Sequence, residues 1–342
     1  MSAPVSAPVS APVRATEALK EVLRDIQAPV REPLERVSQE MWRIVAEDGA
    51  LMPDVTSHLM GMKGKMFRPT LLLLASEIEG QPEPSAVTMA AIVELIHLAT
   101  LVHDDAVDHS VLRRGMPTIN ALFSHQVSVI MGDFLYSRAL LELVELGDLE
   151  PLRVFTRASN QLTLGEIRQL AAVDALAFSE GDYEKLIRHK TAVLFRAACE
   201  VGSLSGARRH REALARYGEC LGMAFQVADD LLDYTEREET TGKPSGLDLK
   251  EHKVTLPLIA ALRTVTPAAR ARVESLFAAA VPTEAEVHEV VEIVSEAGGL
   301  DYARRRGEEF AHEAEAALDG LPASPARTAL EDAIGYVMER RS

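Results

Sequence analysis

Two clusters of aspartates share the pattern D-D-x-x-D, at residues 104–108 (DDAVD) and 229–233 (DDLLD). Each cluster ends an apolar run, residues 95–107 and 221–232, whose spacing predicts a helix. On a helix the first and last aspartates of a cluster share a face, because positions i and i+4 lie one above the other. Carboxylates so placed repel one another and lose hydration beside apolar neighbours. The pattern therefore predicts that a cation compensates each cluster.

Oxygen-only ligands indicate a hard divalent cation. Mg²⁺ usually takes one or two protein carboxylates and completes its shell with water and substrate phosphate, whereas zinc prefers the His and Cys ligands that neither cluster supplies. A solvated acidic helix face is the alternative, and the repetition of the pattern in two apolar helices argues against it. The predicted metal ligands are Asp104, Asp105, Asp108, Asp229, Asp230 and Asp233.

A polyphosphate held by metal ions also requires lysine and arginine side chains. Such residues follow the turns and helices around the two clusters: Lys65 and Arg68, Arg113 and Arg114, Lys190 beside Thr191, and Lys243 and Lys253. The last two lie in the polar segment 235–254, which is longer than most loops of a compact domain. A loop of that length is usually either functional or disordered, and a lid is its functional interpretation.

Composition limits the possible partners. The chain has 36 Lys+Arg against 52 Asp+Glu, a formal charge of −16, which argues against nucleic acid and against a polybasic membrane anchor. Glu94 and His97 interrupt the longest apolar run, residues 89–102, so no membrane span is expected. Cys199 and Cys220 are expected to be free buried thiols. With no signal-peptide pattern at the N-terminus, we expect a cytoplasmic protein.

The elements that must position these residues are helices. Apolar residues recur at helical spacing from Thr16 onward, and strand signatures are scarce. Although 342 residues would suggest two domains, no linker divides the chain. We expect one all-α bundle over residues 16–342. Residues 1–15 contain three Ser-Ala-Pro-Val repeats, in which the prolines predict a disordered tail.

These motifs together resemble those of the trans-isoprenyl diphosphate synthases, the polyprenyl synthetase family. The resemblance covers nearly the whole chain from Thr16, and both aspartate motifs belong to it. It also rests on Leu112-Arg-Arg-Gly115, Gly132-Asp133, Gly165-Glu166 with Gln169, Lys190-Thr191, Phe225-Gln226, Gly242-Lys243 and Lys253-Val-Thr-Leu-Pro257. One departure is His252, which stands where the family usually has glycine. The resemblance implies an all-α bundle around a central cavity.

The resemblance also implies a reaction. An allylic diphosphate bound through three Mg²⁺ between the two motifs ionises, isopentenyl diphosphate attacks the allylic cation, and loss of a proton restores an alkene. The released pyrophosphate would accept that proton. Mg²⁺ and fixed cations would stabilise the charge of the leaving diphosphate, and closure of the 235–254 loop would exclude water.

By the same resemblance, three cations, Arg113, Lys190 and Lys253, act with the catalytic aspartates. These aspartates are Asp104, Asp105, Asp108, Asp229 and Asp230. The three cations would contact the allylic diphosphate, with Thr191, Gln226 and Lys243 nearby. Isopentenyl diphosphate would be bound by Lys65, Arg68, His97 and Arg114. A homodimer is expected from the family.

Product length depends on the residues beneath the first motif. Ile96, Ala99 and Thr100 precede Asp104 by eight, five and four positions, and in the family a bulky aromatic at the last two positions limits the product to short chains. Ala99 and Thr100 are small, so we predict a product longer than C20, with the floor deeper, around residues 129–135 or at a dimer interface. The alternative is that another residue blocks the tunnel and leaves C15 or C20.

Three other functions have to be compared with this one. A terpene cyclase typically has an N/D-x-x-S/T-x-x-x-E second metal motif, whereas this chain has a second D-D-x-x-D. A non-catalytic partner subunit would be expected to lack aspartates or cations of the site, and none is missing. An acidic metal-storage bundle would not explain the accompanying lysines and arginines. Chain elongation remains the favoured prediction, with an apolar product that passes to a membrane by transient contact.

Overall fold

The computed structural model describes residues 11–46, 53–61, 64–113, 115–171, 175–235 and 246–339. Its longer helices are α1 (Ala11–Gln27), α2 (Arg31–Ala46), α5 (Ala86–Val107), α7 (His125–Glu145), α8 (Leu149–Ala171), α10 (Val193–Leu204), α11 (Arg211–Thr235), α17 (Gly299–Leu318) and α18 (Pro325–Glu339). Its shorter helices are α3 (Pro53–Gly61), α4 (Phe67–Ser76), α6 (Ile119–Leu122), α9 (Glu180–Ile187), α13 (Leu247–Lys250), α14 (Leu256–Ala261), α15 (Pro267–Ala278) and α16 (Glu284–Glu296).

Single helical turns and one small hairpin complete the described structure. Three of the turns are 3-10 turns, and the fourth, η3, is a π-helix; they are η1 (Ala28–Val30), η2 (Ala175–Ala177), η3 (Arg188–Ala192) and η4 (Arg208–His210). The hairpin pairs β1 (Leu112–Arg113) antiparallel with β2 (Met116–Pro117). The all-α fold predicted from the sequence is confirmed.

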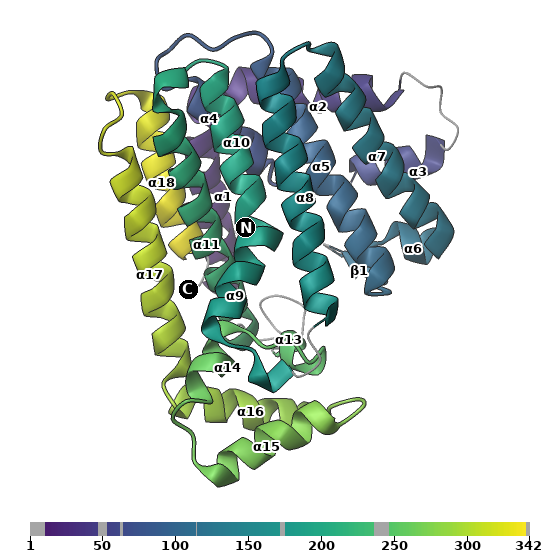
Figure 1. Cartoon of the computed structure of the whole chain (residues 1–342), viewed down its shortest axis with the longest axis vertical. Coiled ribbons are helices and arrows are strands. Elements are labelled where there is room, and N and C mark those ends of the chain that lie inside the picture. The colour runs from purple at the N-terminus through teal and green to yellow at the C-terminus, as the bar shows by residue number, and fades with distance from the viewer. Residues whose placement is uncertain are drawn as a thin grey trace, which may run out of the picture.

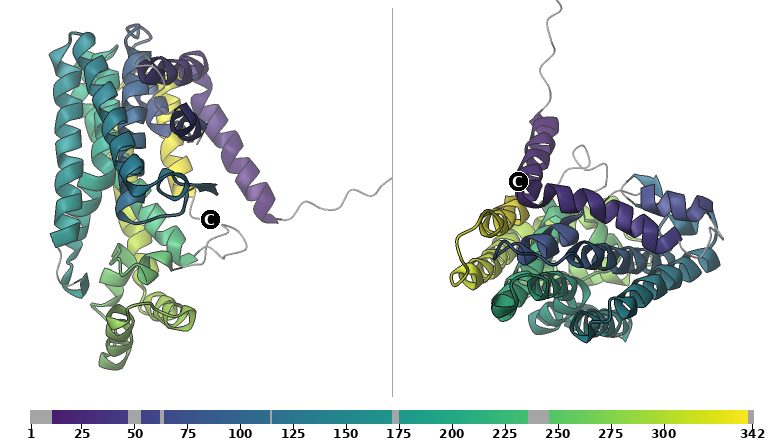
Figure 2. Two further views of the ribbon diagram at one scale, coloured as in Figure 1. Left: turned by 90° about the vertical axis from the view of Figure 1, so that its right-hand side faces the viewer. Right: turned by 90° about the horizontal axis from the view of Figure 1, so that it is seen from above.

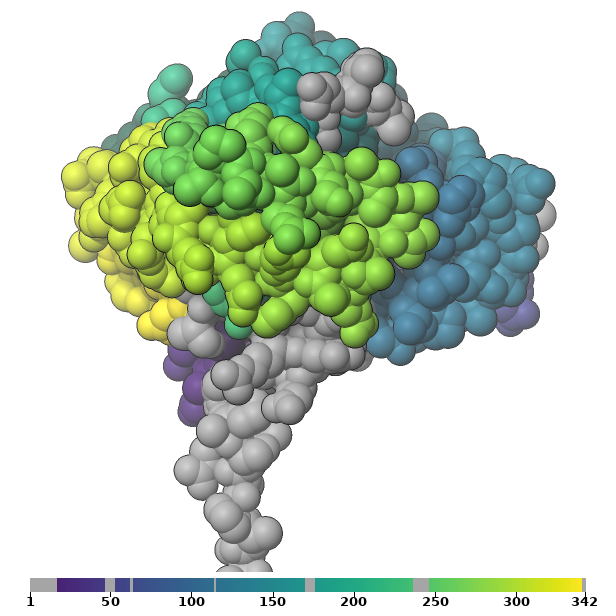
Figure 3. Space-filling view, turned by 90° about the horizontal axis from the view of Figure 1, so that it is seen from below, coloured from purple at the N-terminus to yellow at the C-terminus, as the bar shows by residue number. Residues whose placement is uncertain are grey.

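The long helices run side by side along the length of the molecule, and α15 and α16 lie across one end (Figures 1 and 2). Seen from that end, the segment from about residue 250 to residue 300 covers much of the face between the C-terminal helices and the α5–α7 side (Figure 3). In Figure 1, α13 lies near α15 and α16, with α9 above it, and the hairpin and α6 lie nearer the middle of the molecule. This part of the bundle carries the cavity described below.

Helix α5 is the central element of the bundle. It contacts α2, α4, α7 and α10, and most of its side chains are buried. By length and composition it could also cross a membrane, but 72% of its most apolar window is buried inside the protein, as in a core helix. It ends at Val107, where the N–H of Asp108 still donates to the carbonyl of Asp104 at 2.8 Å.

The N-terminal helix starts earlier than the sequence indicated. α1 begins at Ala11, inside the segment 1–15 for which a disordered tail was expected. Pro12 is its second residue, and a proline in the first turn costs little because its missing N–H would have no intrahelical partner. Residues 1–10 and most of the expected lid, residues 236–245, lie outside the described parts of the chain.

Helices α10 and α11 approach closely because α11 carries glycines where they meet. A Cβ on Gly218 would lie 2.6 Å from the Phe195 carbonyl oxygen, and one on Gly222 would lie 2.6 Å from Cα of Ala192. These glycines therefore set the separation between the helix that follows the Lys190 turn and the helix that carries the second aspartate motif.

We expect Gly218→Ala to destabilise the protein by about 1–3 kcal/mol, because the added methyl meets backbone that cannot yield. Gly335→Ala is the matched control: Gly335 also lies within a helix, but a Cβ there meets nothing within 4 Å, so this change should stabilise by about 0.5–1 kcal/mol. Urea unfolding of both variants measures the difference. Equal effects of the two substitutions would contradict the close-packing account.

Candidate active site

One cavity of about 810 Å³ brings both aspartate motifs together. Its volume falls within the range usual for small-molecule sites. Its walls come from the end of α5, the hairpin, α8, the α9–η3 region, α11, α13 and the segment that follows α13. The polar and charged lining residues are Asp104, Asp108, Arg113, Gln169, Lys190, Thr191, Gln226, Asp229, Asp230, Asp248, Glu251, His252 and Lys253.

The three aspartates of the first motif have different surroundings. Burial raises the pKa of Asp104 to about 6, and the positive charge of Lys190 opposes that rise. Asp105 is 5% exposed and accepts hydrogen bonds from Arg113, with Nε at 2.8 and 2.9 Å from its two oxygens. Asp108 is exposed where α5 ends. Asp104 and Asp108 line the cavity, whereas the negative charge of Asp105 is paired with the positive charge of Arg113 in the hairpin.

The second motif is divided in a similar way. Both oxygens of Asp230 accept hydrogen bonds, Oδ2 from the Tyr183 hydroxyl at 2.6 Å and Oδ1 from Gln226 Nε2 at 2.8 Å. Asp233 accepts two backbone hydrogen bonds at 3.1 Å, from the N–H groups of Leu247 and Asp248. Asp229 lines the cavity. Burial raises the pKa of Asp230 and that of Asp233, and the donated hydrogen bonds oppose both rises.

Lys190 projects from the π-helical turn η3, a distortion that often occurs at functional sites. Its Nζ lies 2.9 Å from Glu166 Oε1 and donates to Gln169 Oε1 at 3.1 Å. Beside it, Thr191 donates to Gln226 Oε1 at 2.6 Å. Thr191 and Gln226 thus bind each other as well as lining the cavity.

Lys253 reaches the cavity from the segment after α13. Its backbone N–H donates to the Asp248 carbonyl at 2.7 Å, and its Nζ lies 2.6 Å from Glu251 Oε2. Burial acts to lower the pKa of Lys253, but the Glu251 hydrogen bond and the charges of Glu251, Asp248 and Asp108 outweigh burial and raise it. Lys253 is therefore a firmly charged cation close to the acidic residues of both motifs.

The residues expected to bind isopentenyl diphosphate lie apart from this lining set. Lys65 Nζ lies 5.5 Å from the centre of the Tyr336 ring, and the Arg68 guanidinium lies 4.7 Å from that of Phe195. His97 is partly buried on α5. Lys65, Arg68 and His97 do not line the 810 Å³ cavity. Two further expected cations, Arg114 and Lys243, lie outside the described residues.

The expected chain-length residues lie on α5 beneath Asp104. Ile96 and Ala99 are 1% and 2% exposed, and the Thr100 hydroxyl donates to the His97 carbonyl at 2.7 Å. All three lie on the interior part of the helix, toward the middle of the bundle.

Sequence reasoning missed three polar residues of the site, Tyr183, Asp248 and Glu251. Tyr183 is fully buried, and nothing in its sequence neighbourhood pointed to Asp230, 47 positions later. Asp248 lines the cavity, and burial raises its pKa to about 6, with the Asp233 charge adding to the rise. Its position in a lysine-bearing polar loop was the only signal. His252 has φ +55°, a left-handed conformation that explains why glycine is usual at this position.

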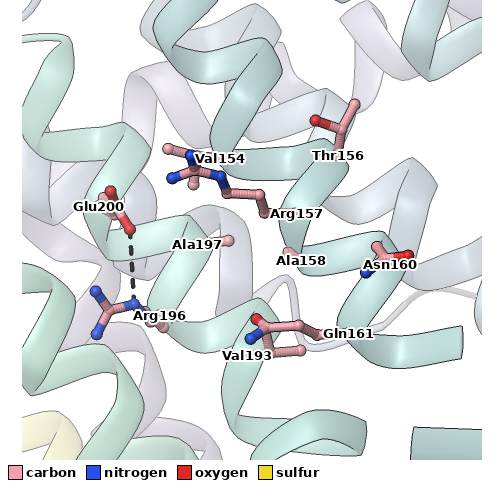
Figure 4. A pocket seen from close by; sticks show the side chains of 10 residues that line it. All are labelled: Val154, Thr156, Arg157, Ala158, Asn160, Gln161, Val193, Arg196, Ala197 and Glu200. Carbon is pink, nitrogen blue, oxygen red and sulfur yellow. Dashed lines mark ion pairs between the residues drawn. The ribbon is translucent and has the colours of Figure 1, made fainter. Parts of the chain in front are cut away.

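A second cavity, of about 520 Å³, lies between α8 and α10 (Figure 4). Its one carboxylate, Glu200, faces Arg196, with Oε2 3.7 Å from the guanidinium Nε. Arg157 and the amides Asn160 and Gln161 complete its polar lining. This cavity lacks the grouped carboxylates of the first one, so we exclude it as the reaction site.

The residues of the 810 Å³ cavity fit a hard divalent cation. Its grouped carboxylates offer oxygen ligands, and the raised pKa of Asp104 reflects buried negative charge that a cation would compensate. Lys190, Lys253 and Arg113 border the same space, so a polyanion could be held beside the cations. Among the described residues, no pre-assembled cluster of three or more metal-ligating side chains is present.

Solved structures show what class of protein this fold and site define. A polyprenyl synthase from Caulobacter crescentus, complexed with calcium and isoprenyl diphosphate, matches with a TM-score of 0.87 at 35% identity, covering 94% of this chain and 98% of that chain. A decaprenyl diphosphate synthase from Rhodobacter capsulatus matches with a TM-score of 0.82 at 35% identity, covering 97% and 99%. The architecture is that of the all-helical isoprenoid synthases, a class in which divalent-metal binding is typical.

Sequence comparison names the family. The family model described as Polyprenyl synthetase matches residues 50–294. The all-trans-nonaprenyl-diphosphate synthase (geranyl-diphosphate specific) of Rhodobacter capsulatus is 40% identical over 293 residues, 85% of this chain and 90% of that protein. The octaprenyl diphosphate synthase of Escherichia coli is 40% identical over 285 residues, 83% and 88%. The chain belongs to the polyprenyl synthetase family and is a prenyltransferase, as its motifs predicted.

The raised pKa of Asp104 predicts that its charge costs stability. Because the folded pKa of about 6 exceeds the ordinary 3.8, the folded state binds more protons, and stability falls as pH rises through this interval. Asp104→Asn should therefore stabilise the metal-free protein at pH 7.5 by about 1–3 kcal/mol, with the gain shrinking toward pH 4.

Thermal unfolding in chelator across this pH range provides the measurement. Asp301→Asn is the control, because the Asp301 side chain is 69% exposed and its replacement should change stability by less than about 0.5 kcal/mol. An Asp104→Asn variant less stable than the parent at pH 7.5 would contradict the burial account.

Proposed function

We propose that the protein elongates an allylic diphosphate by condensation with isopentenyl diphosphate and releases a trans-polyprenyl diphosphate longer than C20. The observation that carries this proposal is the convergence of two aspartate motifs with Arg113, Lys190 and Lys253 on one cavity. A cavity lined by acidic groups alone would suit metal storage. Acidic and basic groups that line the same space suit a metal-bound diphosphate.

The proposed metal is Mg²⁺, three per site with diphosphate bound. We narrow the ligands expected from the motifs to Asp104, Asp108 and Asp229, which line the cavity. Asp230 lines it too, but both of its oxygens accept hydrogen bonds from protein side chains. Asp105, Asp230 and Asp233 are proposed to act as supports, because both carboxylate oxygens of each residue accept hydrogen bonds from protein donors. When bound, the metal would supply Lewis-acid stabilisation of the leaving diphosphate.

The protein's own cations act on the diphosphate. Lys190 and Lys253 would bind its oxygens and stabilise the charge that grows as the C–O bond breaks. To do so they exchange their present partners, Glu166 and Glu251, for the phosphate. Arg113 would add charge from the hairpin while it holds Asp105, and Lys243 is proposed to close over the site with its loop. Shielding of the cavity by that loop would keep water from the allylic cation.

Isopentenyl diphosphate needs a second anion site. We propose Lys65, Arg68, His97 and Arg114 for it, although the first three do not line the described cavity. Phe67 begins α4 with Arg68 beside it, and Met66 before it has φ 51°, so this turn has a defined local shape. The proton lost when the alkene is restored would pass to the released pyrophosphate, so no protein side chain would be needed as a base.

The proposed product length draws on α5 and on the relatives. Ala99 and Thr100 leave no aromatic floor beneath Asp104. The relatives named as nonaprenyl and octaprenyl synthases support a product longer than C20. Geranylgeranyl or farnesyl diphosphate is the alternative product, and structures of geranylgeranyl pyrophosphate synthases also match this fold.

We propose that the enzyme is a homodimer. On α7, Ile130, Leu141 and Val144 are 64%, 50% and 62% exposed, and with Phe134 and Ser137 between them the spacing alternates between four and three residues. These five residues form a stripe, the α7 seam, against which another helix can pack.

Residues 16–342 would form the single catalytic domain, with the N-terminal repeats outside it. The enzyme would be cytoplasmic and would touch the membrane only to release product.

Incubation with labelled isopentenyl diphosphate, an allylic primer and Mg²⁺ tests the proposed reaction. We expect a ladder of products beyond C20, loss of activity in chelator and its return with added Mg²⁺. A cyclised hydrocarbon, or no chain extension by the intact protein, would contradict the proposal.

Ala99→Phe should shorten the main product, because the ring would fill the space beneath Asp104. Leu98→Phe is the matched control, since Leu98 is similarly buried but lines a different, small pocket with Leu59 and Ile119. Chromatography of the dephosphorylated products compares the two variants. Unchanged product length in Ala99→Phe would show that the growing product does not run past Ala99.

Leu141→Glu should convert the dimer into a monomer, because a charge in the α7 seam would be buried against its copy. Val281→Glu is the control, since Val281 is 84% exposed in the turn between α15 and α16. Sedimentation velocity measures both. A parent protein that is already monomeric would refute the seam.

A further inference from the structure

A chain of hydrogen bonds runs along the cavity wall from the Lys190 turn to Tyr183 on α9. The Thr191 hydroxyl donates to Gln226 Oε1 at 2.6 Å, and Gln226 Nε2 donates to Asp230 Oδ1 at 2.8 Å. The chain ends where the Tyr183 hydroxyl donates to Asp230 Oδ2 at 2.6 Å. It therefore connects three elements, η3, α11 and α9, through one carboxylate.

Each link in this chain has a single direction. The Thr191 hydroxyl donates a hydrogen bond to the Gln226 carbonyl oxygen, which leaves the amide nitrogen to donate to Asp230. The carboxylate then receives one hydrogen bond on each oxygen. Asp230 is 5% exposed and Tyr183 is 2% exposed, so water cannot readily replace either donor.

Tyr183 has no other role in the reaction described above. It is not among the lining residues of the cavity, and its ring is packed in the core. The hydroxyl is the one polar group of this side chain, and it donates its hydrogen bond to the second aspartate motif. A phenylalanine would fill the same apolar space without making this bond.

We propose that Tyr183 is a positioning residue for the diphosphate site. By occupying Asp230 Oδ2, it fixes the orientation of this carboxylate in the cavity wall and keeps Gln226 on Thr191. Lys190 and Asp229 are thereby held at a fixed separation from one another. The proposal rests on the proposed function for the nature of the ligand, and its hydrogen-bond geometry is independent of that function.

Tyr183→Phe would leave Asp230 Oδ2 buried without a donor. The carboxylate would then rotate within the cavity wall toward Lys190 or Lys253, which would break its hydrogen bond with Gln226 and release Gln226 from Thr191. Loss of the partner that orients a ligand set typically costs 10–100-fold in metal affinity or activity. We expect at least a 10-fold rise in the KM for the allylic diphosphate and in the Mg²⁺ concentration at half-activation, with the KM for isopentenyl diphosphate changed less than twofold.

Tyr217→Phe is the matched control. Tyr217 is also fully buried, and its hydroxyl donates at 2.7 Å to a backbone carbonyl, that of Leu330, away from the site. Both variants remove one buried hydroxyl, so both should lose comparable stability. Only Tyr183→Phe should change the metal and diphosphate parameters.

Calorimetric titration of pyrophosphate in saturating Mg²⁺ provides a readout that does not depend on turnover. We expect at least 10-fold weaker binding in Tyr183→Phe than in Tyr217→Phe. Asp230→Asn alone and with Tyr183→Phe completes a double-mutant cycle, in which the two changes should be strongly non-additive. Equal pyrophosphate binding by both tyrosine variants, or additive effects in the cycle, would overturn the proposal, whereas an inactive parent protein would instead refute the proposed function.

Discussion

The concentration of negative charge in a partly dehydrated cavity is the constraint on which the rest of the structure depends. Burial raises the pKa of Asp104 and of Asp248 to about 6, and Asp230 is more deeply buried still. Such groups are costly to hold near one another without compensation. The bundle keeps them there because the same cost makes the cavity attractive to cations and to a metal-bound polyanion.

Protein donors compensate only part of this charge. Arg113 binds Asp105, Tyr183 and Gln226 bind Asp230, and two backbone N–H groups bind Asp233. Asp104, Asp108, Asp229 and Asp230 line the open space together with Lys190 and Lys253. Each motif thus both holds the local structure and faces the ligand, and Asp230 does both. A net charge of −16 is compatible with a phosphate substrate because the positive groups are concentrated where phosphate would bind.

Helical spacing of the apolar residues was enough to predict the fold and to place the two aspartate motifs on helices. Apolar residues at three- and four-residue intervals predicted the bundle, and α5 and α11 hold the D-D-x-x-D clusters on their last turns. Local patterns could not reveal partners distant in the chain. Tyr183 reaches Asp230 only because α9 packs against α11, and Glu166 meets Lys190 only because α8 packs against η3. The start of α1 at Ala11 was missed because the proline repeats continue into its first turn.

Cooperation between metal and diphosphate is the central claim, and pyrophosphate binding to the unmodified protein tests it most directly. Isothermal titration should be carried out with Mg²⁺ and, separately, in chelator. We predict clear binding with Mg²⁺ and a loss of at least 100-fold in affinity without it, because the carboxylates alone would repel the ligand. Equally tight binding in chelator would contradict the account, since the lysines and arginines would then hold the diphosphate without the aspartates.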